Sequence, residues 1–276
     1  MKPELEIWID QAEKSWLNEL YTHAKALFRN KSLPSHDHTH HLRVWNLCKA
    51  LLREIATFNS GIDPSLVEGV LIAAFFHDLG MVYSTREDHG RLGSELCLKW
   101  FSDAGRTRPE RMQEILLAIE LHDRKEEQIY ASFTPETPPE ILGILCVADD
   151  LEALGIIGIY RYAEIYLMRG IPLEELGVRI LENVKTRFEH LSEGCYLCGR
   201  LIEQYRKQYD ELCLFFNQYN LQLRTVSQAD AEKSGPLGVI NYIRKPGRNK
   251  NEMEGAVKEV QDYFGKLEHE LEQARL

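Results

Sequence analysis

The chain has 276 residues, enough for one large domain or two small ones, and its 44% hydrophobic and 28% charged content is that of an ordinary soluble globular protein. The formal charge of −10 argues against binding of extended nucleic acid. No uninterrupted apolar run approaches the about 18 residues of a membrane-spanning helix, so we expect no membrane partner.

Helical periodicity dominates the chain from its start. Apolar residues on one face predict a first helix over about 8–28 and a second from about 40 to 58. A third helix is expected to begin at Asp63-Pro64, because Asp63 supplies a cap acceptor and Pro64 is tolerated in the first turn. It is apolar nearly all round and should end near Gly80, at the centre of the core.

The remaining elements are also expected to be helical, because period-2 patterns are scarce. The predicted helices lie at about 91–103, 108–123, 138–153, 156–168, 172–192, 195–218 and 251–274. Residues 227–246 read as looser, since Gly-Pro and Pro-Gly pairs mark turns there. The sequence therefore predicts an all-α protein with a helical domain over 1–220 and a C-terminal helical extension over 221–276.

The start of the chain and its thiols bear on location. The first residues, MKPELEIWIDQAEKSW, are acidic and amphipathic, unlike a signal peptide. Six cysteines accompany no secretory signal, so we expect reduced thiols in a cytoplasmic protein. Cys195 and Cys198 form a lone C-x-x-C, which without a second pair gives little support for a metal or redox site.

Three segments far apart in the chain supply a His, a His-Asp pair and an Asp. His40 lies within SHDHTHHLRV, His77-Asp78 within AAFFHDLGM, and Asp149 within VADDLEALGIIGIYR. Two imidazoles and two carboxylates suit a divalent transition metal or magnesium. Such a set can leave coordination positions open for water and substrate, which indicates hydrolysis.

Each segment alone also has a structural interpretation. His77 and Asp78 close an apolar helix, so they need partners, which could be a metal or hydrogen bonds that tie helices together. The histidines within 36–41 form either a metal site or a solvated turn. In the third segment Asp149 is the better ligand candidate, whereas Asp150 could be an exposed residue.

Together, the three segments resemble the HD-domain superfamily of metal-dependent phosphohydrolases. The patterns H-x-x-R-V, A-x-x-H-D-[LI]-G and A-D-x-L-[DE]-A-L-G-x-I-G-I-x-R match residues 40–44, 74–80 and 148–161. The resemblance implies an HD-domain helical bundle whose metal ligands are His40, His77, Asp78 and Asp149. Relatives often read D-A-D-R-L, whereas this chain has Asp150 in place of the arginine, so a basic substrate contact is not carried over.

Charged residues near these motifs are candidates for catalysis and substrate binding. Asp78 is assigned a catalytic role as well as a ligand role, and Glu87 and Asp88 could supply a general base. Their Arg-Glu-Asp run is also typical of a solvated loop. Arg43 and Arg161, next to the ligand motifs, are expected to hold phosphate oxygens.

Two further histidines, His89 and His122, fall between the second and third ligand segments. Superfamily members with two metals use additional histidines in this interval. Lining of the pocket with contacts to phosphate is the favoured interpretation, and a second metal or no role are the alternatives.

The resemblance implies a metal-dependent phosphohydrolase that acts on a phosphate ester or phosphoanhydride. The expected substrate is a nucleotide or another small phosphorylated metabolite, and the cofactor is a divalent cation such as Mn, Mg, Fe, Zn or Co. One alternative is an HD module that binds metal and nucleotide without hydrolysis, and a less favoured one is a di-iron HD-fold oxygenase. Oligomeric state is open, with a homodimer among the options.

Overall fold

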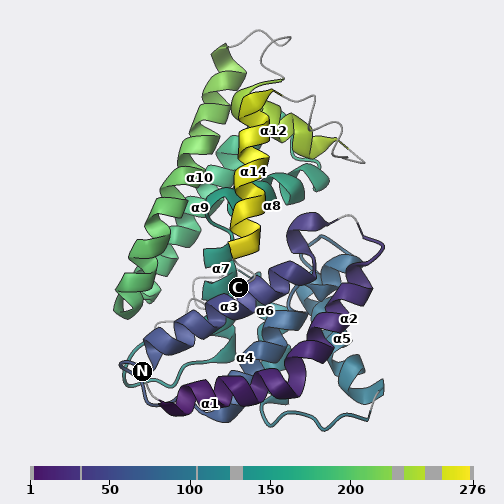
Figure 1. Cartoon of the computed structure of the whole chain (residues 1–276), viewed down its shortest axis with the longest axis vertical. Coiled ribbons are helices and arrows are strands. Elements are labelled where there is room, and N and C mark those ends of the chain that lie inside the picture. Colours follow the sequence, from purple (N-terminus) through teal and green to yellow (C-terminus); the bar gives the residue numbers. More distant parts are fainter. Residues whose placement is uncertain are drawn as a thin grey trace. The chain divides into compact units, whose positions relative to one another are not determined.

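The computed structural model describes residues 3–31, 33–103, 105–124, 133–225, 233–245 and 257–273. Within these residues helices are the only regular elements, which confirms the all-α prediction (Figure 1). The chain forms two compact units, one from Met1–Glu152 with His190–Glu203 and the other from Ala153–Glu189 with Gln204–Leu276. The domain boundary at residue 220 stays a prediction, and in the structure this residue lies inside helix α10 (Gly199–Thr225).

The first unit opens with a long helical segment and the helix that carries His40. A π-helical turn, η1 (Glu13–Leu17), joins α1 (Pro3–Ala12) to α2 (Asn18–Phe28). A short 3₁₀ turn, η2 (Pro34–His36), then precedes α3 (His38–Ile55). Asp37 caps α3 by accepting a hydrogen bond from the Thr39 backbone N–H at 2.9 Å. The cap places His40 in the first turn of the helix.

Helix α4 (Pro64–Phe76) lies in the core of the first unit, where it contacts α1, α3, α6 and α7. It starts as predicted, because Asp63 accepts a hydrogen bond from the Leu66 N–H at 2.7 Å. It ends before the predicted Gly80, and a 3₁₀ turn, η3 (Leu79–Val82), follows. By length and composition alone Pro64–Val82 could cross a membrane, but 89% of its most apolar window is buried inside the protein.

The rest of the first unit is built from α5 (His89–Asp103), α6 (Met112–Leu121), α7 (Ile141–Glu152) and the short turn η4 (Tyr196–Cys198). Two glycines let the end of α4 approach α5 closely. A Cβ on Gly80 would lie 1.9 Å from the His89 carbonyl oxygen, and one on Gly93 would lie 2.6 Å from the Phe76 carbonyl oxygen. Because these neighbours are backbone atoms, the approach requires glycine on both sides.

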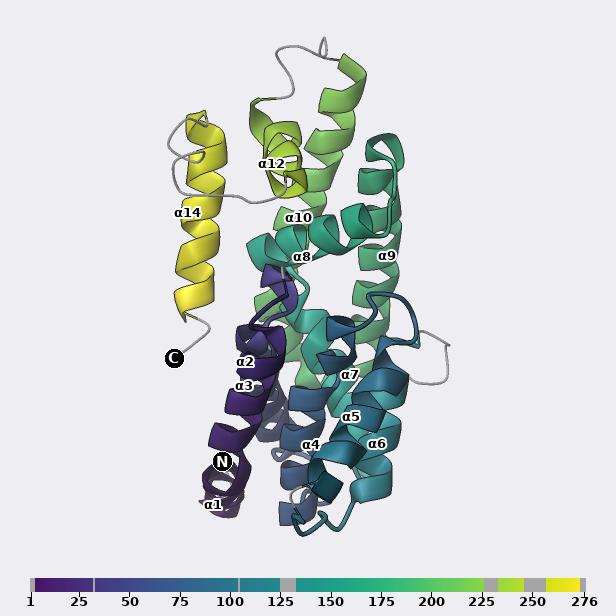
Figure 2. The ribbon, with the colours of Figure 1, turned by 90° about the vertical axis from the view of Figure 1, so that its right-hand side faces the viewer.

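The second unit contains α8 (Gly155–Met168), parts of α9 (Leu173–Gly194) and α10, and two C-terminal helices, α12 (Gly235–Arg244) and α14 (Lys258–Gln273). In this unit α12 and α14 contact α8 and each other (Figure 2). The expectation of a loose 227–246 segment is wrong over α12. Pro236 sits in the first turn, where its missing N–H costs little, and the apolar face of the helix is buried. Of the predicted helix 251–274, residues 251–256 lie outside the described residues.

All six cysteines are free thiols, and all but Cys213 are buried. Burial raises the pKa of the Cys198 thiol to about 12. A buried thiol with a raised pKa is inert, which fits the interpretation of these cysteines as core residues.

Candidate metal centre

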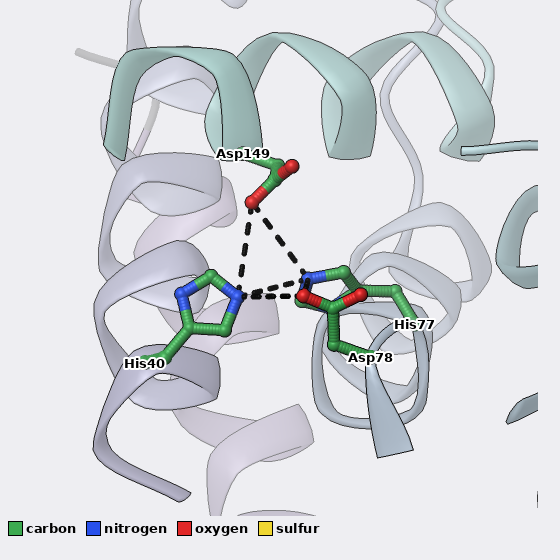
Figure 3. A group of neighbouring side chains, drawn as sticks. All are labelled: His40, His77, Asp78 and Asp149. Carbon is green, nitrogen blue, oxygen red and sulfur yellow. Dashed lines mark hydrogen bonds and ion pairs between the residues drawn. The ribbon is translucent and has the colours of Figure 1, made fainter. Parts of the chain in front are cut away.

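Four side chains converge in the first unit (Figure 3). His40 comes from α3, His77 and Asp78 follow the end of α4, and Asp149 comes from α7. One donor atom of each lies within 4.8 Å of the donor atoms of the other three. The structure therefore brings together the four residues that the sequence named as ligands.

The donor atoms face one another closely. His40 Nε2 lies 3.1 Å from His77 Nε2, 3.3 Å from Asp78 Oδ2 and 3.7 Å from Asp149 Oδ1. His77 Nε2 lies 3.4 Å and 3.8 Å from the same two oxygens. Figure 3 shows Asp149 reaching from α7 toward the two imidazoles, with the Asp78 carboxylate beside them. These donors thus surround one shared position.

The hydrogen bond on the far side of the His77 ring sets its tautomer. His77 Nδ1 lies 2.9 Å from the Ala74 carbonyl oxygen, and because a carbonyl carries no proton, Nδ1–H is the donor. In the neutral ring this leaves a lone pair on Nε2, the nitrogen that faces His40. On His40 the far nitrogen, Nδ1, lies 3.3 Å from Glu152 Oε2, another acceptor. Two Nε2 lone pairs 3.1 Å apart repel unless a proton or a cation lies between them, so this pair needs one or the other.

Asp78 also belongs to a second group, with His89 and His122. Asp78 Oδ1 lies 3.4 Å from His89 Nε2 and 3.2 Å from His122 Nε2. Nδ1 of His89 donates to the Arg86 carbonyl at 2.6 Å, and Nδ1 of His122 donates to the Ile119 carbonyl at 2.8 Å. Both rings therefore turn Nε2 to the carboxylate. Oδ2 of Asp78 therefore faces the first group, and Oδ1 of Asp78 faces the second group.

Burial and charge oppose each other in the pKa values of these residues. Burial acts to lower the pKa of His77, but the Asp78 carboxylate outweighs it and the pKa is raised. The same opposition, with Asp123 contributing, raises the pKa of His89 to about 9. Burial acts to raise the pKa of Asp78, yet the charge of His77 and hydrogen bonds from other histidines hold it well below its usual range. The centre keeps an ionised carboxylate in the interior, which requires positive charge beside it.

Arg43, expected to contact phosphate, has a protein partner in the structure. Its side chain is 2% exposed, and its Nε donates to Glu152 Oε1 at 2.6 Å. Glu152 was not among the predicted site residues, although it occupies the [DE] position of the third motif. The phosphate-binding role of Arg43 stays a prediction. In the structure its contact is with the buried carboxylate of Glu152.

The other predicted site residues belong to neither of the two groups. Glu87 and Asp88 are exposed in the turn before α5, and Asp88 accepts a hydrogen bond from Ser84 Oγ at 2.6 Å. Neither carboxylate belongs to either group, and their role as general base stays a prediction. Arg161 is buried on α8, in the second unit, and its contact with phosphate also stays a prediction.

Two neighbours of the ligands differ from the simplest expectation. Asp150, for which an exposed position was one alternative, is buried, and the side chain of Asp149 is 14% exposed. His36 lies with its Nε2 4.0 Å from Asp78 Oδ2 and its ring centroid 5.3 Å from that of His40. The sequence left a metal site or a solvated turn open for this segment, and His36 is buried.

A helical core that gathers histidines and carboxylates around shared positions is the architecture of a metal-binding protein. Residues 38–154 match the family model described as HD domain. This segment is an HD domain, which confirms the resemblance seen in the motifs, and it contains every residue of both groups. The family suggests a metal-dependent hydrolase. Comparisons with curated proteins and with solved structures found no match.

Proposed function

We propose that the protein is a metal-dependent phosphohydrolase that cleaves a phosphate ester or phosphoanhydride. The observation that carries the proposal is the convergence of four donors whose two imidazoles turn Nε2 to the same position. A divalent cation held by these residues would lower the pKa of bound water from about 15.7 toward 7 and would stabilise charge on a phosphoryl oxygen.

The burial of the donors indicates the side from which substrate reaches the centre. The side chains of His40 and His77 are 0% exposed and that of Asp78 is 3% exposed, so they exclude water on their side. Asp149 is the most accessible of the four, at 14%. We infer that substrate would reach the centre from the Asp149 side.

We further propose that Asp78, His89 and His122 would hold a second divalent cation. From the sequence, His89 and His122 were expected to line the pocket, with a second metal as an alternative. The division of the Asp78 oxygens between two groups supports the second metal, because each oxygen would be available to a different ion.

A nucleotide or another small phosphorylated metabolite is the substrate class we propose. The resemblance of residues 148–161 to the corresponding segment of nucleotide hydrolases supports a nucleotide. The net charge of −10 supports a small substrate over a polymer, because an extended polyanion would be repelled by the acidic surface.

Turnover by the metal-loaded full chain tests the proposal. Protein stripped with a chelator and reloaded with Mn²⁺ is offered nucleoside triphosphates, nucleoside monophosphates and a chromogenic phosphodiester. Metal-dependent hydrolysis is expected, with loss in Asp78→Asn and retention in Asp103→Asn, which makes the same change on an exposed carboxylate. A metal-loaded protein inert on the whole panel, or an active Asp78→Asn variant, would overturn the proposal.

The two-group arrangement also meets a requirement of the oxygenase alternative, which needs two irons. Metal analysis of the purified protein distinguishes the oxygenase from the phosphohydrolase. Fewer than two irons per chain would exclude a di-iron oxygenase. The binding-module alternative is favoured instead if calorimetry shows tight nucleotide binding by protein that does not turn nucleotide over.

A further inference from the structure

We infer that Glu152 and Arg43 are positioning residues that hold the imidazole of His40 in the tautomer that binds metal. The inference rests on the proposed function, because it takes His40 as a metal ligand. It assigns Arg43 to the support of the centre and gives a role to a carboxylate outside both donor groups.

Glu152 stands between an arginine and the metal-site histidine. Its Oε1 accepts a hydrogen bond from Arg43 Nε at 2.6 Å, and its Oε2 lies 3.3 Å from His40 Nδ1. The three side chains are 0–3% exposed. Nδ1 of His40 has no hydrogen-bond partner with good geometry among the described residues, so Glu152 is placed to become its acceptor.

Arg43 is held at its other end as well. Its Nη1 donates to Thr39 Oγ1 at 2.9 Å, and Thr39 Oγ1 donates to Asp37 Oδ1 at 2.5 Å. The guanidinium is thereby fixed between the cap of α3 and Glu152. Because its Nε engages Oε1, the oxygen left for His40 is Oε2. Arg43 also balances the buried charge of Glu152, which would otherwise be costly.

His40 differs from the other histidines in the acceptor that its Nδ1 faces. His77, His89 and His122 each direct Nδ1 to a backbone carbonyl three residues earlier. Nδ1 of His40 makes no hydrogen bond within the described residues, and the carboxylate oxygen Oε2 of Glu152 lies 3.3 Å from it. A carboxylate in this supporting role also makes the imidazole a stronger ligand.

The substitution Glu152→Gln tests the inference because Arg43 dictates how the amide is oriented. Arg43 Nε requires an acceptor, so the amide oxygen faces Arg43 and the NH₂ group faces His40. Nδ1 must then accept, the ring proton moves to Nε2, and the nitrogen that faces the metal loses its lone pair. We expect the affinity for Mn²⁺, measured by calorimetry on the full chain, to fall by about 10- to 100-fold.

The matched control is Glu6→Gln, which makes the same change in another arginine pair. Glu6 accepts from Arg53 Nε at 2.8 Å, and Arg53 lies on α3, the helix that carries Arg43. This control is expected to bind Mn²⁺ like the wild type. Thermal melts of each variant show that the protein measured is folded.

A double substitution distinguishes the loss of His40 positioning from general damage to the fold. In Arg43→Met/Glu152→Gln the amide is no longer held by the guanidinium, so its oxygen can turn to His40 and restore the acceptor. The double variant is expected to regain part of the lost affinity, whereas simple structural damage would make it worse than the single variant. If Glu152→Gln does not fold, Glu152→Asp is used instead. This variant keeps the negative charge at position 152 but withdraws the acceptor from His40, so it is also expected to weaken Mn²⁺ binding.

The outcomes separate this inference from the proposed function. If Glu152→Gln binds Mn²⁺ as tightly as the wild type while His40→Ala loses affinity, the positioning role is overturned and the metal site stands. A double variant no tighter than Glu152→Gln also overturns it. If neither the wild type nor any variant binds a divalent cation, the proposed function falls and the inference falls with it.

Discussion

Asp78 and His122 are 44 residues apart in sequence, yet Asp78 Oδ1 lies 3.2 Å from His122 Nε2. The other oxygen of the same carboxylate, Oδ2, lies 3.3 Å from His40 Nε2. One side chain therefore joins a histidine of α3 with a histidine that directly follows α6. Substitutions in the first and in the second group are therefore expected to have different effects on metal binding.

The substitution His122→Asn is predicted to reduce the number of bound ions from two to one. It removes an imidazole from the second group and leaves His40, His77 and Asp149 in place. Elemental analysis after loading with excess Mn²⁺ and desalting measures the stoichiometry. His269→Asn, which removes an exposed imidazole on α14, is expected to keep both ions. Two ions retained in His122→Asn would contradict a second site at this group.

Divalent cations are predicted to stabilise the wild type against unfolding. An ion that binds the folded state alone adds about 2.7 kcal/mol at a free concentration of 100 times its Kd. The melting temperature in Mn²⁺ and after chelation measures the gain, and chelation should reverse it. Asp78→Asn is expected to show little gain, because Asp78 contributes an oxygen to both groups. Equal stabilisation of this variant would place the ion elsewhere.

The substitution Gly80→Ala is predicted to destabilise the first unit and disturb the second group. The new Cβ would lie 1.9 Å from the His89 carbonyl oxygen and 2.9 Å from the Gly93 nitrogen, and neither backbone atom can swing away. Overpacking of this kind costs about 1–3 kcal/mol or more. Denaturant unfolding measures it. Gly265→Ala, at a helical position with no atom within 4 Å, is expected to be neutral or stabilising, so an equal loss at both sites would refute the steric argument.

Asp63→Ala is predicted to cost about 0.5–2 kcal/mol of unfolding free energy, because it removes the cap of the core helix α4. Partial burial acts to raise the pKa of Asp63, but hydrogen bonds from the Leu66 N–H and Ser65, with the charge of Arg111, outweigh it and lower the pKa. A lowered pKa means that the ionised form stabilises the folded state above the unfolded-state pKa of about 4.

The pH dependence of the unfolding free energy of the same variant checks the direction of the Asp63 pKa shift. The difference in unfolding free energy between wild type and Asp63→Ala should be largest above about pH 4 and shrink as the pH falls through the lowered pKa of Asp63. Asp10→Ala, on the exposed face of α1, is expected to show no such trend. A difference that grows toward acid pH would contradict the capping account.

Local sequence patterns predicted the helices well and the centre in part. The cap at Asp63, the apolar α4 and the four converging donors all follow from short-range periodicity and from the HD-domain motifs. The helix α12 was missed, because Gly235 and Pro236 were taken as turn signals when they begin a helix.

The contacts that complete the centre depend on packing between distant segments. Glu152 meets Arg43 across 109 residues, and no pattern near either residue indicates that pairing. The approach of His89 to Asp78 depends on backbone contact at Gly80 and Gly93. For this reason the sequence named His89 and His122 as candidates but could not place them on one carboxylate.

Anomalous diffraction from crystals soaked in Mn²⁺ tests the central claim most directly. The account predicts a peak at bonding distance from His40 Nε2, His77 Nε2, Asp78 Oδ2 and Asp149, with a second peak between Asp78 Oδ1 and the imidazoles of His89 and His122. Mn²⁺ peaks found only away from these side chains, in crystals that hold the ion, would contradict it.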